Sequence, residues 1–201
     1  MTTVKTPVEN SPLVLHLQPI INLTDEEFFE FCQINRDLRI ERTATGELLI
    51  MPPTGSETGN RNAKLIVQLG VWAERDGTGI YFDSSTGFKL PNGADRSPDA
   101  AWVSQERWDT LTPEQQETFP PLCPDFVIEL RSKSDTMESL RKKMQEYLEN
   151  GLRLGWLIDA KNKRVEIYRL NQEVEVLESP VSLSGEEVLP GFVLDLQVVF
   201  G

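Results

Sequence analysis

The chain has 201 residues, of which 39% are hydrophobic and 26% are charged, and its formal net charge at pH 7 is −12. A chain of this length and composition can bury a core of its own and is expected to fold as one domain. It contains no apolar run approaching the roughly 20 residues of a membrane-spanning helix. The negative charge argues, taken alone, against nucleic acid as a partner, because phosphates repel an acidic surface.

Three features of the sequence bear on cellular location and on the possible kinds of active site: the N-terminus, the cysteines and the single histidine. Residues 1–17 lack the long apolar stretch and the small-residue cleavage site of a secretory signal. Cys32 and Cys123 are far apart and in no metal-like spacing, so we expect free thiols and a cytoplasmic protein. His16 is the only histidine, which excludes zinc sites built from histidines and histidine-dependent triads.

The basic residues are concentrated in one segment. Residues 125–170 hold ten Lys and Arg against eight Asp and Glu, a net charge of +2. The objection that the overall charge raises against nucleic acid is therefore weaker here, although an ordinary solvated helix and hairpin accounts for part of the clustering.

The N-terminal half is predicted to contain an arm, two helices and several strands. Residues 1–22 are expected to be the arm, and residues 23–201 a single domain. Thr24 and Glu27 form a capping box that starts a helix ending at about residue 35. Strands are expected over 38–43, 47–51, 80–82 and 87–90, with an amphipathic helix between 56 and about 75.

The C-terminal half is predicted to contain a buried strand over residues 124–131, followed by a helix over 135–150. Asp99 follows Pro98 and opens an apolar run, so it should lie at the start of a strand. Residues 104–123 are expected to form a short helical excursion and a loop. Further strands are expected over 154–158 and 164–168, and the acidic segment 171–201 is rich in strand patterns.

The buried strand carries charged residues in an apolar setting. Glu129 and Arg131 are two residues apart, so both side chains should leave one face of the strand, whereas Phe126, Ile128 and Leu130 point to the other. A buried charge is costly unless it is paired or holds a metal. Together with Asp99, Glu129 could supply hard oxygen ligands for Mg²⁺ or Mn²⁺, which would activate a water and neutralise charge on a phosphate. The alternatives are a turn role for Asp99 and a structural ion pair for Glu129.

Six segments, in order along the chain, carry a family resemblance: 51–55 (MPPTG), 97–104 (SPDAAWVS), 124–135 (PDFVIELRSKSD), 143–151 with Lys, Tyr and Gly at every fourth position, 155–159 (GWLID) and 189–192 (LPGF). They resemble the Uma2 family, also called DUF820, of the restriction-endonuclease-like PD-(D/E)XK superfamily. The resemblance covers the chain from about residue 23. It implies an α/β (α+β) fold, with a restriction-endonuclease-like mixed β-sheet flanked by helices and extra N- and C-terminal strands. It also implies a metal-dependent DNA endonuclease activity and is compatible with a homodimer.

Transferred position by position, the resemblance makes Asp99 and Glu129 the catalytic metal ligands, with Glu57, at the start of the long helix, as an additional acidic ligand. Arg131 stands where the superfamily has a lysine. Arginine stays protonated, so it can clamp a phosphate but is a poor base for activating water. Lys143 on the following helix is the candidate to replace that lysine. The structural alternatives are a dipole-stabilising role for Glu57, a salt bridge for Arg131 and a solvated Lys143.

The sequence is compatible with three functions. The leading hypothesis is an endonuclease that cleaves DNA with Mg²⁺ or Mn²⁺ through the residues just named. The second is a catalytically silent nuclease fold that binds nucleic acid or a protein partner, which the missing lysine and the acidic surface favour. The third is a protein-interaction module without a nucleic-acid role, whose partner would bind residues 171–201.

Overall fold

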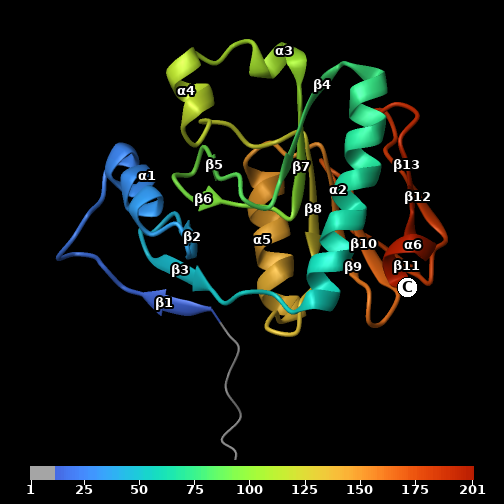
Figure 1. Cartoon of the computed structure of the whole chain (residues 1–201), viewed down its shortest axis with the longest axis horizontal. Coiled ribbons are helices and arrows are strands. Elements are labelled where there is room, and N and C mark those ends of the chain that lie inside the picture. Colours follow the sequence, from blue (N-terminus) through green and yellow to red (C-terminus); the bar gives the residue numbers. More distant parts are fainter. Residues whose placement is uncertain (1–11) are drawn as a thin grey trace, which may run out of the picture.

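The computed structural model describes residues 12–201 and contains two larger β-sheets with helices packed against them (Figure 1). Residues 1–11, the first half of the predicted arm, lie outside the described residues. The second half contains a short strand, β1 (Leu13–Leu15), which pairs with β3 (Leu48–Met51). Within residues 12–201, no helix is long and apolar enough to cross a membrane.

The first sheet, here called the N-sheet, has the strand order β1–β3–β2–β6–β5, and all its pairings are antiparallel. The strands not yet given are β2 (Arg39–Arg42), β5 (Phe88–Lys89) and β6 (Asp95–Arg96). The predicted hairpin of β2 and β3 is present, whereas β6 has no counterpart in the sequence-based prediction. Helix α1 (Asp25–Ile34) begins at the predicted capping box and packs Phe28 against Ile40 and Leu48 on one face of this sheet.

The second sheet, here called the central sheet, has the order β11–β10–β9–β8–β7–β4. Only β8 and β9 are parallel among these neighbours, so the sheet is mixed, as predicted. Its strands are β4 (Gly79–Asp83), β7 (Ala100–Ser104), β8 (Phe126–Leu130), β9 (Leu154–Asp159), β10 (Arg164–Arg169) and β11 (Glu175–Glu178).

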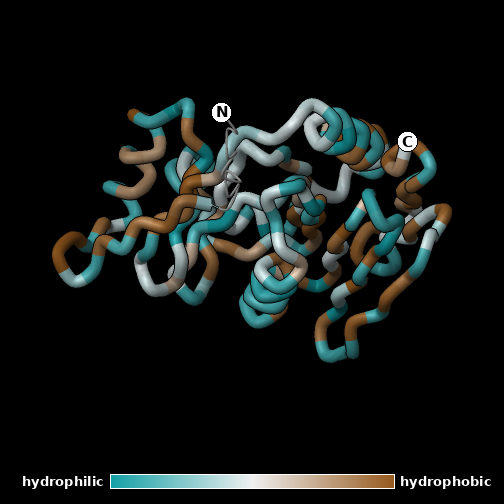
Figure 2. The backbone as a smooth tube through the Cα atoms, turned by 90° about the horizontal axis from the view of Figure 1, so that it is seen from below, coloured by the Kyte–Doolittle hydropathy of each residue, from teal (hydrophilic) through white to brown (hydrophobic). Residues whose placement is uncertain are grey.

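Two long helices cover opposite faces of the central sheet. Helix α2 (Ser56–Asp76) packs on the face to which Phe126, Ile128 and Leu130 point. Helix α5 (Met137–Glu149) packs on the other face, where Met144 contacts the cluster that contains Val127. The alternation predicted along this strand is therefore confirmed. Figure 2 shows hydrophobic and hydrophilic residues alternating along the helices, as expected for helices with one buried side.

The remaining elements close the two ends of the fold. Two short helices, α3 (Gln105–Trp108) and α4 (Pro113–Glu117), occupy the predicted excursion between β7 and β8. The C-terminal hairpin of β12 (Ser182–Ser184) and β13 (Val193–Asp195) and helix α6 (Leu196–Phe200) pack into the core on the α2 side. The extra C-terminal strands were predicted, and α6 was not.

The attachment of α5 to the central sheet can be tested at Met144, whose side chain is fully buried. We expect Met144→Ala to lower the free energy of unfolding by about 2–5 kcal/mol, because truncation leaves a cavity. Gln145→Ala, on the exposed side of the same helix, should change it by less than about 0.5 kcal/mol. Urea denaturation of the two variants measures both values, and equal losses would contradict the packing described.

Candidate active site

Asp99 and Glu129 meet where two neighbouring strands of the central sheet lie side by side. Ala100 of β7 pairs antiparallel with Ile128 of β8, so the same register continued by one residue sets Asp99 opposite Glu129. Residues directly opposite each other project to the same face of a sheet. Both side chains are largely buried, with exposed fractions of 7% for Asp99 and 3% for Glu129.

Asp99 is held by groups from three different elements. Its Oδ2 accepts a hydrogen bond from the backbone N–H of Leu130 at 2.8 Å. Its Oδ1 accepts from Nδ2 of Asn62 on α2 at 3.1 Å and faces Nη1 of Arg39 on β2 at 3.4 Å. The carboxylate therefore links the central sheet to α2 and to the N-sheet.

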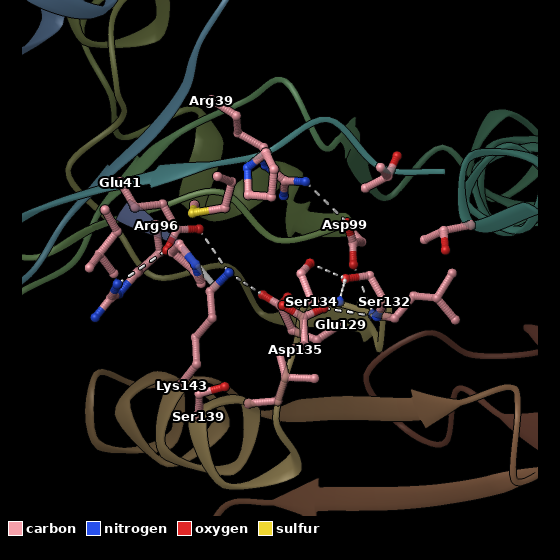
Figure 3. Close-up of a pocket in the computed structure, with 18 of the residues that line it drawn as sticks. Arg39, Glu41, Arg96, Asp99, Glu129, Ser132, Ser134, Asp135, Ser139 and Lys143 are labelled. Carbon is pink, nitrogen blue, oxygen red and sulfur yellow. Dashed lines mark hydrogen bonds and ion pairs between the residues drawn. The ribbon is translucent and has the colours of Figure 1, made fainter. Parts of the chain in front are cut away.

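Lys143 lies between two buried carboxylates from different sheets. Its Nζ is 2.8 Å from Oε1 of Glu129 on β8 and 2.8 Å from Oε1 of Glu41 on β2. Figure 3 shows Lys143 reaching from α5 toward these acids. Tyr147, one helical turn further on, donates its hydroxyl to the same Oε1 of Glu129 at 3.0 Å. The helical spacing of Lys143 and Tyr147 thus brings both to one oxygen atom.

Glu41 is a site residue that the sequence reasoning missed. Its Oε1 accepts the backbone N–H of Ser97 at 3.0 Å, and its Oε2 is 3.1 Å from Nη1 of Arg96. Arg96 also contacts Oε2 of Glu146 on α5 at 2.6 Å through its Nε. The alternation in residues 39–42 could have set Arg39 and Glu41 on the face opposite Ile40. It carries no information about which element lies against that face.

Burial and neighbouring charges of opposite sign have opposite effects on the pKa values of Glu129, Glu41 and Lys143. Burial, together with repulsion from Asp99 and Glu41, raises the pKa of Glu129 to about 7 despite Lys143. Burial also acts to raise the pKa of Glu41, but Lys143 and Arg96 outweigh it and lower that pKa to about 2. Burial acts to lower the pKa of Lys143, and its two carboxylate partners reverse this and raise it. Lys143 is therefore held as an ammonium ion.

These side chains line a cavity of about 310 Å³ between the N-sheet, β8 and α5 (Figure 3). The charged residues of its lining are four cations and five acids: Arg39, Arg96, Lys142, Lys143, Glu41, Asp99, Glu129, Asp135 and Glu146. The cavity is thus close to neutral although the chain carries −12. A single divalent cation would make it positive.

Two of the sequence-predicted site residues lie elsewhere. Arg131 follows the last residue of β8 and pairs with Asp159 at the end of β9, with Nη1 and Oδ2 2.5 Å apart. Glu57 is 67% exposed at its side chain and pairs with Arg61 one turn along α2 at 2.7 Å. Neither lines the cavity that holds Asp99 and Glu129. The cation that the structure brings to Glu129 is Lys143.

The donor set of the cavity suits one kind of metal site. In residues 12–201, no group of three or more His, Cys, Asp or Glu side chains is arranged to hold a metal ion. Magnesium sites often use only one or two carboxylates and complete their shell with waters and substrate phosphate oxygens. Asp99 and Glu129 fit this open type, whereas a closed four-ligand site of the structural zinc type has no basis in these residues.

Comparisons with known proteins identify the family. Residues 25–197 match the family described as "Uma2: Putative restriction endonuclease". The chain therefore belongs to the Uma2 family. It is also similar to a solved structure of "a putative nuclease belonging to DUF820 from Anabaena variabilis", with 19% sequence identity and a TM-score of 0.71 over 89% of this chain and 98% of that chain. This likeness confirms the predicted fold class. A comparison with curated proteins finds no match.

The lowered pKa of Glu41 makes its contribution to stability depend on pH. Because the folded pKa is about 2 and the ordinary value is 4.5, the contribution is complete above pH 4.5 and is lost as the pH falls through 2. Glu41→Gln lacks this titration. The difference in the free energy of unfolding between wild type and variant should therefore shrink by roughly 2 kcal/mol between about pH 6 and about pH 3. Urea denaturation across this range measures it, and a constant difference would refute the assignment.

Proposed function

We propose that this chain is a metal-dependent DNA endonuclease of the PD-(D/E)XK type. The observation that carries the proposal is the placement of Asp99 beside Glu129 on adjacent strands, with the ammonium of Lys143 2.8 Å from Glu129 in one cavity. Membership of a family of putative restriction endonucleases, and a fold shared with a putative nuclease, support the same class of activity.

Asp99 and Glu129 are the residues that would hold a divalent cation. Such an ion supplies charge neutralisation at the scissile phosphate and lowers the pKa of a bound water. Both polar contacts of Glu129 converge on Oε1, and among the described residues no hydrogen bond reaches Oε2. Lys143 and Tyr147 therefore orient the carboxylate and leave one oxygen for a ligand.

Lys143 acts in this proposal as a fixed positive charge. Glu41 and Glu129 keep it protonated, so it would position the attacking water and stabilise the negative charge of the transition state instead of removing a proton. Arg39 lines the cavity next to Asp99. Its planar guanidinium suits contact with a phosphate oxygen.

A catalytically silent nuclease fold is the second candidate, and one observation favours it. Both oxygens of Asp99 already accept hydrogen bonds, from Leu130, Asn62 and Arg39. Lys143 likewise already compensates Glu129. A site satisfied by its own protein groups does not need a metal ion in order to be stable. Such a protein would bind DNA in a salt-sensitive manner without cutting it.

The two candidates are separated by a plasmid-nicking assay combined with calorimetry. With Mg²⁺ or Mn²⁺ we expect nicking of supercoiled DNA, and its loss in Asp99→Asn and Glu129→Gln, because these changes remove the metal ligands. Glu114→Gln, an exposed carboxylate on α4, serves as the matched control and should keep full activity. Absence of both nicking and metal binding, with DNA binding that weakens as salt rises, would establish the silent protein instead.

Whether Lys143 or Arg131 supplies the positive charge at the reacting centre is tested by Lys143→Met and Arg131→Met. Each change removes the charge but keeps most of the apolar stem. We expect the first to lower kcat by about 100-fold or more, because it removes charge stabilisation at the reacting centre. Arg131→Met should lower kcat by less than about tenfold, since Arg131 pairs with Asp159 outside the cavity. Melting temperatures of both variants control for folding, and the reverse order of the two effects would assign the role to Arg131.

A further inference from the structure

The wall that the N-sheet gives to the cavity is divided into a charged row and an apolar row. Arg39 and Glu41 of β2 and Leu49 and Met51 of β3 all line the cavity. The β2–β3 register pairs Arg39 with Met51 and Glu41 with Leu49, so the two rows lie side by side on one face of the hairpin. Ile40 belongs to the cluster on the opposite face of the sheet, against α1.

The strand order fixes which row lies deeper in the molecule. β2 pairs on its other side with β6, which carries Arg96, while β3 pairs on its other side with the edge strand β1. The charged row thus adjoins Asp99 and Glu129, and the apolar row lies toward the edge of the sheet, where Pro12 also lines the cavity. Leu49 and Met51 are only half-buried, so they present apolar surface to the cavity.

A nucleotide has the same division into a charged end and an apolar end. Its phosphate would lie at the acids and cations, and its base would then reach the apolar row. A volume of about 310 Å³ is at the lower end of the range of small-molecule sites, which is roughly 300–1,000 Å³. This space is large enough for a single nucleotide.

We propose that Leu49 and Met51 form a subsite for an unpaired nucleobase next to the scissile phosphate, so that the substrate is single-stranded or locally unpaired DNA. This inference rests on the proposed nuclease function. A base inside a duplex has both faces stacked and its edge paired, so it must leave the stack before it can reach such a row. Because Asp99 and Glu129 are 7% and 3% exposed, the phosphate must itself enter the cavity to reach them.

The chemistry of the subsite also predicts how selective it is. Leu49 and Met51 have no side-chain hydrogen-bond donor or acceptor capable of strong pairing with a base edge, and sequence is read mainly through such bonds. Apolar contact with a base face is available to every base. The apolar row should therefore favour unpaired DNA without distinguishing one base from another.

The first measurement compares three labelled DNAs of one sequence: a single strand, a blunt duplex and a duplex with a short unpaired bulge. With Mg²⁺ or Mn²⁺, we expect kcat/KM for the single strand and the bulge to exceed that for the blunt duplex by about tenfold or more. Equal cleavage of all three would overturn the subsite and leave the nuclease standing. No cleavage of any of them would overturn the nuclease function itself.

The second measurement is the binding of the same DNAs with Ca²⁺ in place of Mg²⁺, followed by fluorescence anisotropy. Ca²⁺ takes the same kind of oxygen ligands and keeps the cavity positive, and the binding signal does not depend on cleavage. Met51→Ala and Leu49→Ala should each weaken binding of the single strand by about fivefold through lost contact area. Met51→Leu should restore binding, because it keeps an apolar side chain of similar size. Val67→Ala, which truncates a 61% exposed valine on α2, is the matched control and should bind as wild type.

The two measurements together decide the proposal. A preference for the single strand that both alanine variants reduce and Met51→Leu restores supports the subsite, even for a protein that does not cleave. Wild-type binding and cleavage by both alanine variants would overturn it, as would equal affinity of the wild type for single strand and blunt duplex.

Discussion

The site depends on the two ion pairs that the ammonium of Lys143 forms with Glu41 and Glu129. Two carboxylates from different sheets, Glu41 and Glu129, lie in the same buried region, and each would be costly there without a cation. Removing one partner of a buried ion pair costs about 3–5 kcal/mol, because it leaves a charge uncompensated. The N-sheet, the central sheet and α5 are therefore coupled through one nitrogen atom. The positions of Glu41 and Glu129 therefore depend on how rigidly α5, the helix that carries Lys143, packs against the central sheet.

The docking of α5 is fixed by contacts on more than one side of the helix. Met144 and Tyr147 pack into the cluster between α5 and the central sheet. On another side, Arg141 donates to both carboxylate oxygens of Glu166 on β10, with distances of 2.9 Å from Nε and 2.6 Å from Nη2. Rotation of the helix about its axis would break this bidentate contact and expose apolar side chains. Lys143 consequently reaches the acids from a preset direction, as a catalytic or binding group requires.

Sequence reasoning recovered the parts of the site that local periodicity controls. The alternation in β8 separated Glu129 from Phe126 and Ile128, and the four-residue spacing on α5 aligned Lys143 with Tyr147. The pattern did not identify the partner on the neighbouring strand. Continued by one residue, the parallel β8–β9 register sets Arg131 opposite Asp159, which pairs with its guanidinium. Glu57 is held by Arg61 within its own helix. Glu41 could not be found locally, because it is 102 residues from Lys143 in sequence.

The hairpin of β2 and β3 divides two tasks between its strands: β2 supplies charged contacts to the acids, and β3 supplies apolar cavity lining. Its charged strand touches the acids through Arg39 and Glu41, whereas Leu49 and Met51 on the next strand line the cavity without contacting them in the hydrogen-bond and ion-pair network. Substitutions on β3 can therefore change the shape and polarity of the cavity while the carboxylates and their cations keep their positions. In engineering terms, Leu49 is therefore the position in this wall to randomise first.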